Sequence, residues 1–124
     1  MPLKDQLLQQ IAQCKRIVLS SEVSEYVLNN AQPKLAAKMI RNIMLLDEFG
    51  LSLPDEYIHR IWESKEKLWA LRVKFADRNE RVLFFAVGEK FLLTNCFNKK
   101  SDKISLSEIR KAERIFHEYL KRKG

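Results

Sequence analysis

The chain has 124 residues, a length typical of one domain that buries enough surface to fold without a disulfide or a metal. Hydrophobic residues make up 46% of it and charged residues 31%, a composition that argues against disorder. Lys and Arg number 23 against 16 Asp and Glu, so the net charge of +7 predicts a polyanionic partner, either a nucleic acid or an acidic protein.

The first residues are predicted to form a helix. Apolar residues recur at helical spacing from Leu3 to Ile11, and the remaining positions are polar. We expect residues 1–15 to be a helical extension that lies outside the domain formed by residues 16–124. A β-branched run over residues 16–19 then predicts a short strand.

Two further helices are predicted to pair as an antiparallel hairpin. A serine pair offers an N-cap to a helix over residues 23–28. Pro33 suits the first turn of a helix over residues 34–49, because its missing N–H would have no partner there. Residues 51–67 are interpreted as a connection with one helical turn at residues 56–63.

The pattern then changes to the alternation of a strand. Residues 68–75 carry Leu71 and Val73 on one face, with Arg72 and Lys74 on the other. Two more apolar runs follow after short polar turns, and the three runs predict an antiparallel meander that helices cover. They span residues 68–75, 81–87 and 91–97.

The chain closes with a predicted helix. Ser105 or Ser107 can cap it, and apolar residues from Ile109 to Leu120 form its buried stripe. The order of elements predicts an α+β fold with an N-terminal helical hairpin, an antiparallel sheet of three to four strands and a C-terminal helix.

The sequence offers no membrane span, signal peptide or metal site. No apolar run reaches the roughly 20 residues that a transmembrane helix needs, so we expect a cytoplasmic protein. Cys14 and Cys96 lie far apart without CxxC spacing and are interpreted as reduced, small hydrophobic residues. Besides these two cysteines, only His59 and His117 could bind zinc, and the four residues lack the spacing of a zinc site. We therefore predict neither a metal nor a cofactor.

Basic residues gather on the predicted sheet. Arg72 and Lys74 share one face of their strand, Arg81 opens the next strand, and Lys99 and Lys100 follow the third. Such a cluster suits RNA cleavage without a metal, because guanidinium groups stabilise the negative charge of the transition state. A Lys among other cations has a lowered pKa and could act as the general base. Spacing alone favours a simpler interpretation, the solvated face of an ordinary sheet.

Aromatic and histidine residues add candidates for RNA binding. Phe97 and Tyr119 could stack on a base, although core packing is the simpler role for both. His117 lies among basic residues of the last helix, including Arg114, whereas His59 is interpreted as a lone surface histidine. Four other aromatic residues are predicted to fill the core: Trp69, Phe84, Phe85 and Phe91.

Five ordered motifs resemble a known family. The chain from Arg16 to Tyr119 resembles the RelE superfamily of toxins from type II toxin–antitoxin systems, in its HigB-like, phage-derived branch. The motifs are KLAAKMIRNIMLLDEFG at 34–50, LWALR at 68–72, RVLFF at 81–85, FNKK at 97–100 and EIRKA at 108–112.

The resemblance implies a RelE-like fold and a ribosome-dependent mRNA endonuclease that inhibits translation. It also implies a cognate antitoxin, of helix-turn-helix type, that carries the toxin to operator DNA. Carried over residue by residue, it assigns Arg72 to the catalytic face and Arg81 and Lys100 to the scissile phosphate. Lys99 completes the double basic motif, and Tyr119 matches a tyrosine of the terminal helix.

The sequence departs from the family pattern at several positions. Ala70 stands where a Glu is usual, Asn95 and Cys96 replace a frequent His-Gly pair, and Ser105 replaces a Pro. Since an amide does not exchange protons at neutral pH, we do not expect histidine-based acid catalysis at Asn95. These departures leave an alternative open, a non-catalytic protein of the same fold that poisons gyrase or only binds an antitoxin on operator DNA. A third interpretation is a generic basic RNA-binding module.

Overall fold

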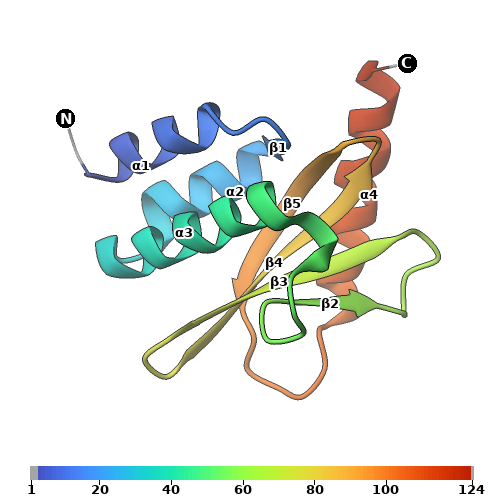
Figure 1. Cartoon of the computed structure of the whole chain (residues 1–124). Helices are drawn as coiled ribbons and strands as arrows, with labels where there is room; N and C mark the ends of the chain where they lie inside the picture. Colours follow the sequence, from blue (N-terminus) through green and yellow to red (C-terminus); the bar gives the residue numbers. More distant parts are fainter. Residues whose placement is uncertain (1–2, 124) are drawn as a thin grey trace.

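The computed structural model describes residues 3–123 and is shown in Figure 1. It contains four α-helices, two short helical turns and five strands within these residues. In chain order they are α1 Leu3–Ala12, β1 Ile17–Leu19, α2 Ser21–Glu25, the π-helical turn Tyr26–Asn30, α3 Pro33–Phe49, the 3₁₀ turn Gly50–Ser52, β2 Ile58–Ile61, β3 Leu68–Phe75, β4 Arg78–Val87, β5 Lys90–Asn98 and α4 Leu106–Lys123.

The five strands form one mixed sheet between two helical layers. Their order is β1-β5-β4-β3-β2, with β1 parallel to β5 and every other neighbouring pair antiparallel. Helices α1, α2 and α3 lie on one face of the sheet and α4 lies on the other (Figure 1). The predicted α+β class, with N-terminal helices and a C-terminal helix, is therefore confirmed.

The sheet is wider than predicted because residues 58–61 form a strand. The predicted helical turn at 56–63 is wrong, since β2 pairs antiparallel with β3. Ile58 and Ile61 are three residues apart, a spacing that imitates a helix. In the strand they point to opposite faces, so that Ile58 joins the core under α3 and Ile61 the core under α4. The sheet is also not purely antiparallel, because β1 runs parallel to β5.

The N-terminal helices pack around α3. Ser20 caps α2 by accepting a hydrogen bond from the N–H of Val23 at 3.3 Å, and Pro33 begins α3 as predicted. Helix α1 lies against α3 and buries Ile11 in the same core. The predicted extension over residues 1–15 is therefore helical over Leu3–Ala12, whereas residues 1 and 2 lie outside the described residues.

The sheet separates two apolar cores, one on each of its faces. Phe84 and Phe91 pack edge to face at 5.6 Å on the side of α1–α3, and Phe85 stacks on Phe116 of α4 at 4.2 Å. These aromatic residues fill the core as predicted, whereas Trp69 is only half-buried. No helix among the described residues is long and apolar enough to cross a membrane.

Helix α4 is fixed to β5 at its first turn. Ser105 caps the helix by accepting a hydrogen bond from the N–H of Glu108 at 3.3 Å. The side chain of Asn95, buried on β5, donates to the carbonyl of Glu108 at 3.2 Å and to its carboxylate at 2.9 Å. Asn95 thus anchors α4. The hairpin between β3 and β4 extends beyond α4 (Figure 1), so that part of this face of the sheet stays uncovered.

Candidate active site on the open face of the sheet

The register of β3 and β4 places two arginines directly opposite each other. Arg72 and Arg81 are cross-strand partners, and both lie on the face that α4 covers only in part. Cross-strand neighbours on one face lie within about 5.5 Å at Cβ, so like charges there repel each other. Arg81 is only 8% exposed, and its guanidinium donates to the carbonyl of Glu80 at 3.1 Å. The predicted meeting of basic groups is therefore present at this pair.

The third strand brings an aromatic residue and two lysines to the same place. Phe97 is the cross-strand partner of Arg81 on β5, and it also packs against the core under α4. Lys99 follows two residues later, held by a backbone hydrogen bond to Asn79 at 2.8 Å. Arg81, Lys99 and Lys100 line an open pocket of about 360 Å³, together with Asn79, Ser101 and Asp102.

His59 completes the group from the edge strand β2. It lies on β2 opposite Ala70, on the same face as Arg72. Burial lowers its pKa to about 4, with further lowering by the positive charges of Arg72, Arg81 and Lys99. The imidazole is therefore neutral at pH 7, and its Nε2 is buried with no hydrogen-bond partner among the described residues. The interpretation of His59 as a lone surface histidine is wrong. We call His59, Arg72, Arg81 and Lys99 the cationic cluster.

Among the described residues, no carboxylate forms a salt bridge with Arg72, Arg81 or Lys99. Burial and the charge of Arg72 lower the pKa of Arg81. Burial, followed by the charges of Arg81 and Arg72, also lowers the pKa of Lys99, whereas Asp102 raises it. The Nε atoms of Arg72 and Arg81 are buried without a hydrogen-bond partner in the part of the chain described. Buried donors without partners cost stability, so this arrangement suits the binding of an anion such as a phosphate.

Two predicted site residues lie at the margin of the cationic cluster. Lys74 shares the face of Arg72 but is exposed, opposite Asn79 near the end of the hairpin. It is not among the charges that act on His59. Lys100 is exposed as well and lines the pocket beside Lys99. Their catalytic roles stay predictions.

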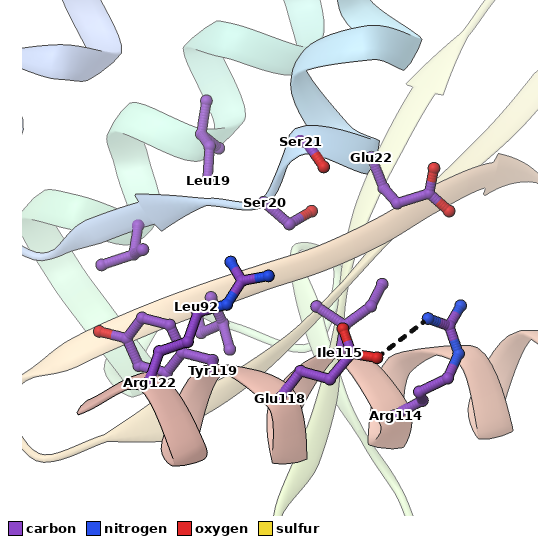
Figure 2. A pocket seen from close by; sticks show the side chains of 11 residues that line it. Leu19, Ser20, Ser21, Glu22, Leu92, Arg114, Ile115, Glu118, Tyr119 and Arg122 are labelled. Carbon is purple, nitrogen blue, oxygen red and sulfur yellow. Dashed lines mark hydrogen bonds and ion pairs between the residues drawn. The ribbon is translucent and has the colours of Figure 1, made fainter. Parts of the chain in front are cut away.

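Three of the predicted RNA-binding residues lie elsewhere, on α4. Arg114 and Tyr119 line a second pocket of about 420 Å³ between α4, β5 and the turn from β1 to α2. Figure 2 shows Arg122 reaching from α4 toward the strands beside Tyr119, while Arg114 faces Glu118 at 3.5 Å. Tyr119 is 13 residues along the helix from Leu106, or roughly 20 Å at 1.5 Å per residue. These residues therefore do not join the cationic cluster.

His117 is also separate from the cationic cluster, because it has a carboxylate partner. Its Nε2 lies 3.0 Å from the Oε1 of Glu66, which belongs to the loop between β2 and β3. The pairing holds the end of this loop against α4, which is a structural role.

Neither thiol belongs to the cationic cluster. Both cysteines are free, and burial raises the pKa of Cys14 and of Cys96, so neither favours the reactive thiolate. Among residues 3–123, no group of three or more His, Cys, Asp and Glu side chains is placed to hold a metal ion.

Comparison with known proteins gives one match. The family model described as "Phage derived protein Gp49-like (DUF891)" matches residues 27–117. This range contains all of the cationic cluster and every strand except β1. The match agrees with the phage-derived resemblance of the five motifs, whereas the HigB-like branch stays a prediction. No curated protein and no solved structure matches the chain.

Proposed function

The chain belongs to the Gp49-like family of phage-derived proteins, which is commonly associated with the toxins of toxin–antitoxin systems, and we propose that it is a toxin that cleaves mRNA on the ribosome. Its partners would be a cognate antitoxin of helix-turn-helix type, the ribosome and mRNA, and operator DNA through the antitoxin.

One observation carries this proposal: Arg72 and Arg81 face each other on an open sheet with no carboxylate bonded to either side chain in the described residues. Two like charges on adjacent strands repel each other, and burial adds to the cost. A bound phosphodiester would remove both penalties, because guanidinium groups bind phosphate oxygens with two parallel hydrogen bonds.

His59 is suited to accept the proton of the attacking hydroxyl group. It is unprotonated at pH 7 and lies on the face of Arg72, and the negative charge of a bound phosphodiester would raise its lowered pKa, so it can take the proton of a ribose 2′-hydroxyl. The 2′-oxygen then forms a bond to phosphorus while the bond from phosphorus to the 5′-oxygen breaks. In this proposal His59 lies next to the attacking hydroxyl, instead of Lys74 or Arg72.

Lys99 is suited to protonate the leaving group. Its lowered pKa makes the ammonium a stronger acid than an ordinary lysine, and the departing 5′-oxygen accepts its proton. Arg72 and Arg81 stabilise the charge on the non-bridging oxygens during the displacement. The products are a 2′,3′-cyclic phosphate and a 5′-hydroxyl, with no metal needed at any step.

A translation extract tests the proposal. Purified protein added to an extract should cut mRNA within codons, leave 5′-hydroxyl ends, and remain active in the presence of a chelator. Removing one transition-state donor costs about 10²–10³ in rate, so Arg81→Ala should lose cleavage by that factor. Arg41→Ala is the matched control, since Arg41 is exposed on α3, on the other face of the sheet from the cationic cluster.

The same assay distinguishes the alternatives. If wild type and Arg81→Ala stall translation equally, the proposed nuclease is wrong. Breaks in DNA without RNA cleavage would instead support the gyrase poison. Binding of naked RNA with a steep salt dependence, unaffected by ribosomes, would support a simple RNA-binding module.

A further inference from the structure

An exposed indole lies at the edge of the sheet, outside the cationic cluster. Trp62 follows β2, and 77% of its surface is exposed. The guanidinium carbon of Arg60 lies 4.6 Å from the centroid of a Trp62 ring and 5.8 Å from that of a Trp69 ring. Trp69 is the cross-strand partner of Arg60. The three side chains form a stack whose outer member is Trp62, and we call them the Trp62 stack.

Folding stability does not account for the Trp62 stack. A side chain that keeps 77% of its surface in water contributes little hydrophobic free energy. Arg60 forms no salt bridge with any described residue, and its Nε is buried without a hydrogen-bond partner. A flat cation is therefore held under an aromatic ring that faces solvent. This arrangement is suited to receive a ligand.

The charges around the Trp62 stack favour an anionic ligand. Lys65 and Lys67 are exposed on the loop between β2 and β3. Of the two acidic residues of this loop, Glu66 is bonded to His117, and Glu63 is exposed. Arg60, Lys65 and Lys67 thus leave a positive balance beside an aromatic surface. Single-stranded nucleic acids are bound by this combination, with bases on the aromatic rings and phosphates on the cations.

We propose that the Trp62 stack binds an unpaired base of single-stranded RNA, with Lys65 and Lys67 at the neighbouring phosphates. Arg60 and Trp69 lie on the opposite face of the sheet from His59 and Arg72, but β2 is the edge strand, and Trp62 comes three residues after His59 along it. An RNA strand held at Arg72 and Arg81 can therefore continue over the edge of the sheet to Trp62. That this RNA is the cleaved mRNA rests on the proposed function, whereas binding itself does not.

A binding assay with an RNA that cannot be cut tests the inference. The probe is a labelled 12-nucleotide 2′-O-methyl RNA, which lacks the attacking hydroxyl, titrated with the full-length protein. Stacking on one aromatic ring accounts for roughly tenfold or more in affinity. Trp62→Ala should therefore raise the Kd about tenfold or more, whereas Trp62→Phe, which keeps a flat ring, should change it less than about threefold. The probe should also quench the tryptophan fluorescence of the wild-type protein.

The control variant is Phe49→Ala, because Phe49 is an aromatic residue that is 49% exposed at the end of α3. Its Kd should equal that of the wild type. The melting temperature of Trp62→Ala should not fall, since the side chain is mostly in solvent. A duplex of the same sequence should show no dependence on Trp62, because its bases are already stacked.

Several results would overturn the inference. The inference is wrong if the wild type and Trp62→Ala bind RNA equally. It is also wrong if the substitution lowers the affinity for duplex and for single-stranded RNA by the same factor. If Trp62→Ala weakens only a complex with a partner protein, the Trp62 stack is a protein contact and the RNA assignment is wrong. Cleavage together with RNA binding that does not depend on Trp62 refutes this inference alone, whereas Trp62-dependent binding without cleavage refutes the nuclease alone.

Discussion

Arg78 and Arg81 lie three residues apart on β4 and point to opposite faces of the sheet. On the face covered by α1–α3, Arg78 is bonded to Glu80 at 2.9 Å and to the hydroxyl of Tyr26 at 3.1 Å. The hydroxyl of Tyr26 in turn donates to Glu80 at 2.5 Å. On the other face Arg81 meets Arg72 and has no carboxylate partner in the part of the chain described.

The pKa shifts follow this difference. The hydrogen bond to Glu80 raises the pKa of Arg78, whereas burial lowers that of Arg81. The first arginine completes a buried hydrogen-bond network, and its charge is balanced within the fold. The second is held in a position that costs stability, as is common for residues kept for function. One strand therefore separates a structural charge from one available to a ligand.

The largest expected effect comes from Arg81→Met. This substitution keeps the volume of the side chain but removes its charge, so cleavage should fall about 10²–10³-fold. The free energy of unfolding should stay the same or rise by up to about 1 kcal/mol, because the repulsion from Arg72 disappears. Urea unfolding and the cleavage assay measure the two effects. A clear loss of stability would mean that Arg81 is structural like Arg78.

For Glu80→Gln we expect a clear loss of stability. Glu80 is fully buried, and its loss leaves Arg78 without its ion-pair partner and weakens the bond from Tyr26. Hydrogen bonds to charged groups contribute about 1.5–3 kcal/mol, so the free energy of unfolding should fall by about 2 kcal/mol. Urea unfolding measures it, and Asp55→Asn, at an exposed position, is the control. An unchanged stability would show that the network of Arg78 and Glu80 is not structural, and the contrast between Arg78 and Arg81 would be wrong.

The pH dependence of stability should report on His59. An unfolded histidine binds a proton below pH 6.5, whereas folded His59 stays neutral until about pH 4. The unfolded state therefore takes up more protons in this window, and stability should fall as the pH drops from 6.5 to 4. Because solvent screens part of the effect, we expect a loss on the order of 1 kcal/mol.

Two histidine variants show which histidine causes that pH dependence. His59→Gln should flatten the change in unfolding midpoint between pH 6.5 and 4, whereas His117→Gln, at an exposed position, should leave it in place. A flat wild-type profile in this range would show that burial and the neighbouring positive charges do not hold His59 neutral.

The smallest effect is expected at the cap of α4. Ser105→Ala removes the acceptor for the N–H of Glu108 and should lower the unfolding free energy by about 0.5–1 kcal/mol. Ser107→Ala is the matched control and should change it little. Thermal unfolding measures both variants. Cleavage should persist in each, because neither serine belongs to the cationic cluster.

The sequence predicted best what local patterns determine. Alternation over residues 68–75 predicted β3 and the shared face of Arg72 and Lys74, and Ser105 was among the expected caps. Strand β2 was missed because a four-residue strand with isoleucines at both ends imitates a helical turn. Pairing of β1 with β5 joins residues more than 70 positions apart, and no local pattern gives its direction.

The candidate site was predicted only in part for the same reason. The proximity of Arg72 and Arg81 was expected from the hairpin, but their register was not, because β4 begins at Arg78 instead of at Arg81. His59 enters the cationic cluster through β2, and its lowered pKa comes from burial and from charges on other strands. Arg114 and Tyr119 were candidates for RNA binding because they lie on the basic last helix, but the length of α4 separates them from the cationic cluster.

The pairing of β1 with β5 has a consequence for how the chain folds. The β3–β4–β5 meander uses short loops and can form early, whereas Ile17 reaches Phe91 only by closing a loop of about 75 residues. Contacts at such long separation slow folding. We expect the meander to be the nucleus and the docking of the N-terminal segment to be the late step. During synthesis, the first helices must therefore wait for most of the chain to emerge.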